Sequence, residues 1–146
     1  MDFSHLYLST EGRIGRKMWW IGHIILGVIG LIVASIFVSL FGQMSFATRL
    51  LNFIYVLVVA YPAYAVSAKR FQDRNKSGAL GAILIGIGAL SALLQLFGIG
   101  TDPMHPGALS AILGIAVLIV AIWYLIDLGI LRGTDGENQY GPDPVG

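Results

Sequence analysis

Four long apolar runs constrain the fold of this chain more than any other feature of its sequence. They cover residues 18–41, 50–66, 79–100 and 107–131, and short polar or charged segments separate them. The first run has 24 residues and the shortest has 17, close to the ~20 apolar residues that an α-helix needs to cross a bilayer. We therefore predict an all-α integral membrane protein, a single domain with four transmembrane helices.

The composition also points away from a soluble domain. Hydrophobic residues make up 56% of the chain and charged residues 12%, whereas soluble domains contain about 25% charged residues. Cysteine is absent from the sequence, which excludes disulfides, thiolate zinc sites and cysteine lipidation. Three cations precede the first apolar run, as in a signal peptide, but that run exceeds the ~7–15 residues of a signal sequence and lacks a suitable cleavage site. We expect it to be a transmembrane helix.

The distribution of Lys and Arg predicts how the chain is oriented in a membrane. Residues 1–17, 67–78 and 132–146 together hold eight of the nine cations, and Arg49 is the ninth. Cytoplasmic segments of membrane proteins are enriched in Lys and Arg. We therefore predict that these three segments, which include both termini, are cytoplasmic.

A short amphipathic pattern lies near the start of the chain. Phe3, Leu6 and Tyr7 recur at helical spacing, so they would share one face of a helix. This pattern predicts a short N-terminal helix that lies on the membrane surface.

The charged segment at residues 69–78 mixes several kinds of side chain. Asp73 follows Arg70 by three residues and precedes Arg74 by one, so an extension of the preceding helix would pair the acid with Arg70. Ser77 is a natural N-cap for the third span. A loop that only set the topology and attracted anionic lipid would not need this mixture. We therefore expect a defined, folded turn, and a plain basic loop is the alternative.

Two ionisable side chains, His23 and Asp127, lie within the predicted spans, each about five residues from its cytoplasmic end. Such groups are functional candidates, and a proton-relay pair is one interpretation. The other is that they are satisfied polar groups that tie helix ends together. We expect their helices to be neighbours, with the side chains within reach of each other or of a cation of residues 69–78. Asn52 and Gln95, nearer the other face, predict hydrogen bonds between helices.

The sequence carries no recognisable catalytic or metal-binding motif. Its three histidines, His5, His23 and His105, lie in different segments without the spacing of metal ligands. A nucleophile elbow, a P-loop and a dinucleotide-binding fingerprint are also absent from the sequence. We therefore expect no metal, no cofactor, no enzymatic activity and no nucleic-acid partner.

The C-terminal tail is expected to fold back under the helices rather than to hang free. It combines three acidic residues with an aromatic one, Tyr140, and with the stiff Pro-Asp-Pro of residues 142–144. Tyr140 is expected to pack near Trp19. We expect the tail's acidic side chains to pair with cations of the same face, with Asp135 or Glu137 against Arg70, Arg74 or Arg13.

Three motifs of this chain resemble those of one known family. Residues 12–20 read G-R-I-G-R-K-M-W-W, residues 69–78 read K-R-F-Q-D-R-N-K-S-G, and residues 133–144 read G-T-D-G-E-N-Q-Y-G-P-D-P. They are similar to the G-R-x-x-R-x-x-[FY]-W, R-R-L-H-D-x-x-x-S-G and G-x-x-G-x-N-x-[FY]-G-x-D-P motifs of a bacterial inner-membrane family, the YhaH-like proteins with domain of unknown function 805. The likeness covers residues 1–144 in order and spacing.

The chain departs from the family pattern at two positions. Gln72 stands where the family's loop has a histidine, and Met18 stands where its first motif often has an acidic residue. Acid–base or metal chemistry at the loop histidine is therefore not expected in this chain. The resemblance implies a multi-pass protein of the bacterial inner membrane, and it implies no particular activity.

Our leading hypothesis is a non-enzymatic membrane protein whose cytoplasmic face binds anionic lipid headgroups, a protein partner or a second copy of the chain. A small transporter or channel subunit with His23 and Asp127 on a polar path is the alternative, and an enzyme acting on lipid headgroups ranks third. The near absence of polar residues at mid-bilayer counts against transport. The candidate cytoplasmic site comprises Arg13, Arg16, Arg70, Asp73, Arg74, Ser77, Glu137, Asn138, Tyr140 and Asp143.

Overall fold

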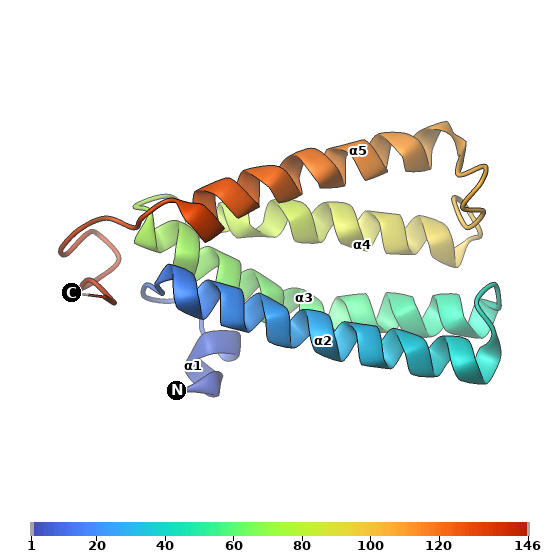
Figure 1. Ribbon diagram of the computed structural model, residues 1–146, viewed down its shortest axis with the longest axis horizontal. Coiled ribbons are helices and arrows are strands. Elements are labelled where there is room, and N and C mark those ends of the chain that lie inside the picture. Colours follow the sequence, from blue (N-terminus) through green and yellow to red (C-terminus); the bar gives the residue numbers. More distant parts are fainter. Residues whose placement is uncertain (1, 146) are drawn as a thin grey trace.

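The computed structural model describes residues 2–145, and all regular elements within this range are helices. Four long helices form two hairpins (Figure 1), namely α2 (Arg16–Phe41) with α3 (Phe46–Asp73), and α4 (Ala82–Leu96) with α5 (Gly107–Tyr124). Three short elements complete the fold, and these are α1 (Phe3–Leu8), the 3-10 helix η1 (Gly78–Gly81) before α4, and the π-helix η2 (Leu125–Ile130) after α5.

Four helical stretches are long and apolar enough to cross a membrane, as predicted. They have 26, 28, 19 and 24 residues and cover Arg16–Phe41, Phe46–Asp73, Gly78–Leu96 and Gly107–Ile130. Along these stretches, large apolar side chains such as Leu31, Val58 and Ile119 are more than 60% exposed in the isolated chain. A water-soluble protein rarely exposes so much contiguous apolar surface, whereas hydrocarbon is a suitable solvent for it.

The second span differs most from the prediction, which gave it residues 50–66 and made it the shortest. α3 has 28 residues and ends only at Asp73. Lys69, Arg70 and Asp73 therefore belong to a helix rather than to a loop, and all three are at most 2% exposed. The helix can extend through them because protein groups, rather than water, satisfy their charges.

The third span begins as the sequence predicts but ends earlier. The Oγ atom of Ser77 accepts a hydrogen bond from the Ala79 amide at 3.3 Å, which confirms Ser77 as the N-cap. Residues 79–100 were expected to form the span, yet α4 ends at Leu96. Gly98 and Gly100 have φ angles of +82° and +71°, and left-handed glycines of this kind end helices because other residues are strained there.

The N-terminal segment contains the helix α1, with Asp2 as its N-cap. The Oδ1 atom of Asp2 accepts a hydrogen bond from the His5 amide at 3.2 Å. At the other end of α1, the Lys69 ammonium donates hydrogen bonds to the carbonyls of His5 and Leu6. Lys69 thus ties α1 to the end of α3, and the position of α1 on a membrane surface stays a prediction.

Buried side chains gather at one end of the bundle. The apolar part of this cluster includes Leu6, Trp19, Phe71 and Leu128, from four different elements. Helix η1 packs directly on α3 there, since a Cβ atom at Gly81 would lie 2.9 Å from the Ala68 backbone nitrogen. The N- and C-terminal segments lie at this same end (Figure 1).

Candidate functional site

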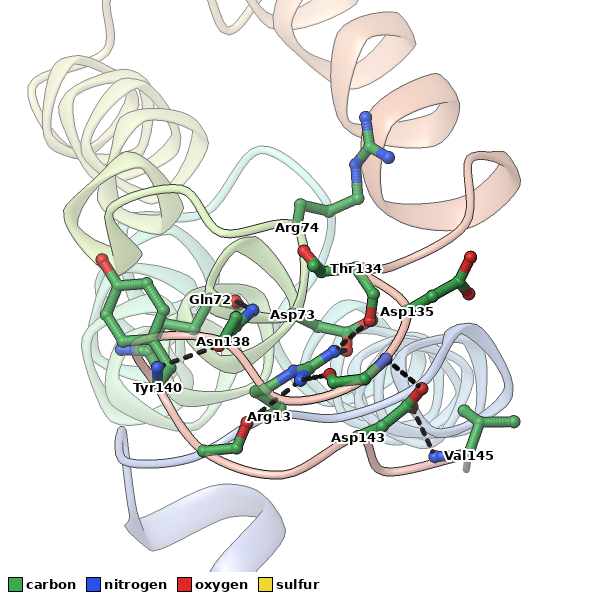
Figure 2. Close-up of polar contacts among 12 residues, drawn as sticks. Arg13, Gln72, Asp73, Arg74, Thr134, Asp135, Asn138, Tyr140, Asp143 and Val145 are labelled. Atoms are coloured by element: carbon green, nitrogen blue, oxygen red, sulfur yellow. Dashed lines mark hydrogen bonds and ion pairs between the residues drawn. The ribbon is translucent and has the colours of Figure 1, made fainter.

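Four segments that are distant in the sequence meet at the end of the bundle that holds the termini. They are residues 2–20, 65–81, 123–132 and the tail at 133–145, and we call their assembly the charged end. Figure 2 shows its centre, where Arg13 and Asp73 lie between the end of α3 and the tail. All ten residues of the predicted cytoplasmic site lie in these segments.

Asp73 is the centre of a buried ion cluster. Its Oδ1 atom accepts a hydrogen bond from Arg13 Nε at 3.0 Å, and its Oδ2 atom accepts one from Arg70 Nη1. The exposed fractions are 2% for Asp73, 7% for Arg13 and 0% for Arg70. The sequence correctly predicted the pairing of Asp73 with Arg70 three residues earlier. Because a buried charge without a partner is costly, each member of this cluster stabilises the position of the others.

Arg13 also holds the C-terminal tail. Its Nη1 atom donates to the carbonyls of Gly136 at 2.6 Å and Gly141 at 3.0 Å, and its Nη2 atom donates to that of Thr134 at 2.6 Å. Figure 2 shows the tail looping around this guanidinium. One buried arginine therefore joins α3 to three points of the tail.

The tail has a defined shape of its own. Asn138 and Gly141 form an isolated antiparallel bridge, and the Asn138 Oδ1 atom accepts a hydrogen bond from the Tyr140 amide at 2.9 Å. The Asn138 Nδ2 atom donates to the Gln72 carbonyl at 3.0 Å, which fixes this turn to the end of α3. Asp143 accepts hydrogen bonds from two tail amides, those of Gly136 at 3.1 Å and Val145 at 2.9 Å.

The tail docks as predicted but by different contacts. Asp135 lies 3.6 Å from the exposed Arg132, and no ion pair within residues 2–145 joins Asp135 or Glu137 to the three predicted arginines. Glu137 is exposed, and Tyr140 is half-buried on the tail turn, without a ring contact to Trp19 among the described residues. The prediction was wrong about the partners because the backbone carbonyls of the tail also accept hydrogen bonds from arginine, and Arg13 binds three of them.

Arginines also cap the C-terminal end of the fourth span. The last carbonyls of a helix lack partners within it and carry a partial negative charge. Three side chains donate four hydrogen bonds to carbonyls of this end, and the bonds are Arg70 Nε to Leu128 at 2.7 Å, Trp20 Nε1 to Gly129 at 3.2 Å, Arg16 Nη1 to Ile130 at 2.9 Å and Arg70 Nη2 to Leu131 at 2.5 Å. Two arginines and one tryptophan therefore cap this helix end.

Asp127 links this capped helix end to the turn after α3. Arg74 Nε donates to its Oδ1 atom at 2.9 Å, and its Oδ2 atom accepts hydrogen bonds from Lys76 and, at 3.2 Å, from Trp123 Nε1. Arg74 also donates to the Arg132 carbonyl. Asp127 is 3% exposed. The prediction that this acid meets a cation of residues 69–78 is therefore confirmed.

His23 belongs to a separate set of contacts. Its Nδ1 atom lies 3.1 Å from the Trp19 carbonyl and its Nε2 atom 3.3 Å from Ser67 Oγ. Helix α2 does contact η2, so the two helices are neighbours. Within residues 2–145, however, no hydrogen bond or ion pair links His23 to Asp127 or to a cation, and the two do not form the predicted polar pair.

The N-terminal segment is attached to α2 by Tyr7. Its hydroxyl donates to the Gly22 carbonyl at 3.0 Å, and burial raises the pKa of this phenol above its ordinary value. Tyr7 therefore remains a neutral donor at physiological pH.

Sequence reasoning missed four residues that build the charged end, namely Lys69, Lys76, Trp123 and Gly133. Trp123 could have been found, because it lies one helical turn before Asp127 and so shares its face. Lys69 and Lys76 were counted only as charges, and their positions in the sequence do not reveal their partners. Gly133 was quoted only as the first residue of a motif.

The chemistry of the charged end is mainly that of a closed hydrogen-bonded assembly. Its buried guanidinium and ammonium groups are bound to carboxylates and to backbone carbonyls. No group of three or more His, Asp or Glu side chains within residues 2–145 is placed to hold a metal ion. Three cations of this assembly, Arg16, Lys17 and Arg132, are exposed.

Comparison with known proteins gives relatives but no solved structure. Residues 7–142 match the family model described as "Protein of unknown function (DUF805)". The chain is 34% identical to "Uncharacterized protein YiiR" of Escherichia coli K12, over 98% of this chain and 90% of that protein. It is 27% identical to "Inner membrane protein YhaH" and 25% identical to "Inner membrane protein YhaI" of the same strain, each over 94% of this chain, with 88% and 87% of the relatives covered.

No solved structure matches the chain. The family model spans nearly all of the described chain and includes the first two motif segments and residues 133–142 of the third, so the agreement covers the spans and most of the charged end. This chain therefore belongs to the DUF805 family, proteins of unknown function that include inner-membrane proteins.

Proposed function

We propose that this protein is a non-enzymatic, multi-pass protein of the bacterial inner membrane whose charged end faces the cytoplasm and binds anionic lipid headgroups. The orientation is supported by the cation count, because eight of the nine Lys and Arg residues belong to segments of the charged end. Two named relatives are inner-membrane proteins. With an even number of spans, both termini share one side of the membrane.

One observation carries the lipid-binding proposal. Arg16 and Lys17 begin α2, Arg132 follows η2, and these two helix ends are neighbours. Trp20 lies beside them, 40% exposed, with its indole bonded to the Gly129 carbonyl. Tryptophan and basic residues at the ends of spans occupy the headgroup layer of a bilayer. Three exposed cations therefore lie at two neighbouring helix ends, where lipid phosphates would be within their reach.

A cavity opens beside these cations. It has a volume of about 190 Å³, and Arg16, Arg70 and Arg132 supply its basic lining. Three acids also line it, but each has a partner of its own. Asp73 is bonded to arginines, Asp135 lies 3.6 Å from Arg132, and Asp143 accepts two tail amides.

The size of the effect is modest but measurable. Each cation near an anionic membrane surface contributes about 1 kcal/mol, so the three exposed cations together would contribute about 3 kcal/mol. Every 1.4 kcal/mol changes a binding constant tenfold. A clear preference for anionic over zwitterionic lipid is therefore expected.

The non-enzymatic part of the proposal rests on the buried acids. Asp73 and Asp127 are the acids that burial could prepare for acid–base chemistry. Each is already held by two cations, an arrangement that suits a structural role.

The test measures which lipids stay bound to the protein. The wild type and the triple variant Arg16→Gln/Lys17→Gln/Arg132→Gln are placed in nanodiscs of phosphatidylethanolamine and phosphatidylglycerol, and native mass spectrometry counts the retained lipids. We expect the wild type to retain phosphatidylglycerol preferentially and the triple variant to lose that preference.

The matched control is the charge-conserving triple variant Arg16→Lys/Lys17→Arg/Arg132→Lys, which should keep the preference. If the wild type retains both lipids in their bulk ratio, or if the neutral triple variant retains as much phosphatidylglycerol as the wild type, the lipid-binding proposal is wrong.

A further inference from the structure

At the opposite end of the bundle, a second pocket lies between the two hairpins. It has a volume of about 300 Å³, a size typical of small-ligand sites. Its lining comes from α2, α3, α4 and both loops of this end, and its polar members include Arg49, Asn52 and Gln95.

Arg49 supplies the cation of this pocket. Within residues 2–145, its guanidinium makes no hydrogen bond or ion pair, and its Nε atom is buried. Its Nη1 atom reaches the turn after α4, where a Cβ atom on Gly98 would lie 2.9 Å away. The acid of this end, Asp102, is exposed and engaged with His105 and the Met104 amide. A buried guanidinium donor without an acceptor is costly near a membrane.

Three carboxamides also line this pocket. Asn52 and Gln95 were expected to bond helices together, but their side chains, like that of Gln43, make no hydrogen bond within the described chain. Asn52 is half-buried, and Gln43 and Gln95 are exposed. At the charged end, by contrast, arginine, lysine and asparagine side chains are bonded to protein groups. The unbonded Arg49 guanidinium therefore contrasts with the buried arginines of the charged end, which are bonded to protein groups.

Two ordinary explanations for Arg49 fit less well. Capping of the α4 C-terminus is already done by backbone groups, because the amides of Phe97 and Ile99 bond to the Leu94 carbonyl. Extension into water would leave Nε unsatisfied, because this atom is buried although the residue as a whole is half-buried. A cation–π contact with Phe46 at 6.0 Å orients the side chain but supplies no acceptor.

We propose that this pocket binds an oxyanion, a carboxylate or a phosphate, attached to an apolar body. The guanidinium of Arg49 and the amide groups of Asn52 and Gln95 supply donors to the oxyanion, as guanidinium groups do for planar acids and phosphates. Ala34, Phe37, Val38 and Met44 supply apolar lining to the same pocket. The pocket lies where four spans end, so the oxyanion can belong to a lipid headgroup or to a free organic acid.

The test observes Arg49 directly. The chain has six arginines, so a ¹H–¹⁵N spectrum of the labelled protein in maltoside micelles resolves few Nε–H signals. The Arg49→Gln variant identifies the Arg49 signal by its disappearance. Hexanoate is the probe, and hexan-1-ol and hexylammonium, with the same chain and different head groups, are the controls.

We expect hexanoate to shift the Arg49 Nε–H signal saturably and the two controls to leave it unchanged. The double variant Asn52→Ala/Gln95→Ala should bind hexanoate at least about tenfold more weakly, because hydrogen bonds to charged groups contribute that much. The Lys17→Gln variant, changed at the other end, should match the wild type. Unchanged hexanoate affinity in the double variant would overturn the assignment of the donors.

Dihexanoyl phosphatidylglycerol, added in place of hexanoate, distinguishes the two sources of the oxyanion. A saturable shift with this lipid and displacement of hexanoate by it would assign the pocket to a lipid headgroup. A shift with hexanoate alone would assign it to free organic acids. If neither probe shifts the signal saturably, or if hexan-1-ol shifts it equally, the proposed oxyanion site does not exist.

Discussion

Gly133 lies directly against the carboxylate of Asp73. A Cβ atom at Gly133 would be 2.1 Å from Asp73 Oδ2, so a larger residue there requires one of the two to move. The next residue, Thr134, donates its amide to the Asp73 carbonyl at 2.8 Å. The buried ion cluster and the first residues of the tail are therefore built around each other.

Replacing Gly133 with alanine is expected to destabilise the protein. The added methyl group must displace the Asp73 carboxylate or the tail, and overpacking of this kind typically costs about 1–3 kcal/mol. Thermal unfolding in detergent, followed by the loss of monodisperse protein, measures the effect. Gly114→Ala is the matched control, because a Cβ atom there has no neighbour within 4 Å. Equal unfolding temperatures for the two variants would show that the close contact does not matter.

Neutralising Asp73 is expected to be more severe. The Asp73→Asn variant leaves Arg13 and Arg70 buried without their counter-charge, and breaking a buried pair in this way costs about 3–5 kcal/mol. Asp135→Asn is the control, because its partner Arg132 is exposed and pairs of that kind contribute little. The same unfolding measurement should show a large loss for Asp73→Asn and almost none for Asp135→Asn. A variant Asp73→Asn as stable as the wild type would mean that the cluster does not hold the charged end together.

Membrane topology can be tested with reporter fusions. A reporter fused after residue 75 or at the C-terminus should report the cytoplasm, and one near Met104 should report the other side, because of the Lys and Arg distribution. A C-terminal reporter on the side opposite to the one after residue 75 would contradict the four spans. Both reporters outside the cytoplasm would contradict the proposed orientation alone.

The sequence predicts the spans well because the apolar runs depend only on local composition. It fails at the end of α3 for a physical reason. Lys69, Arg70 and Asp73 look like loop residues, yet they stay helical because α1, η2 and Arg13 satisfy them. No local pattern contains those partners, since they come from segments about 60 residues away or more.

The sequence predicted the candidate site only in part, again because many of its contacts join segments that are distant in the sequence. Complementary charge correctly suggested that the tail docks, and the pair Arg70–Asp73 followed from helical spacing. Charge could not show that Arg13 would bind the carbonyls of Thr134, Gly136 and Gly141, because every residue of the tail has a carbonyl. Pairing of acids with arginines was the simpler expectation, and it was wrong.

The charged end is a closed assembly only if Arg13 holds the tail in place, and amide hydrogen exchange of residues 133–145 measures this directly. The wild-type protein in detergent should protect this segment, since the amides of Thr134 and Gly141 are bonded. The Arg13→Gln variant should exchange much faster there, while the Lys17→Gln control should match the wild type. Exchange in the wild type as fast as in a free peptide of the same sequence would contradict a docked tail.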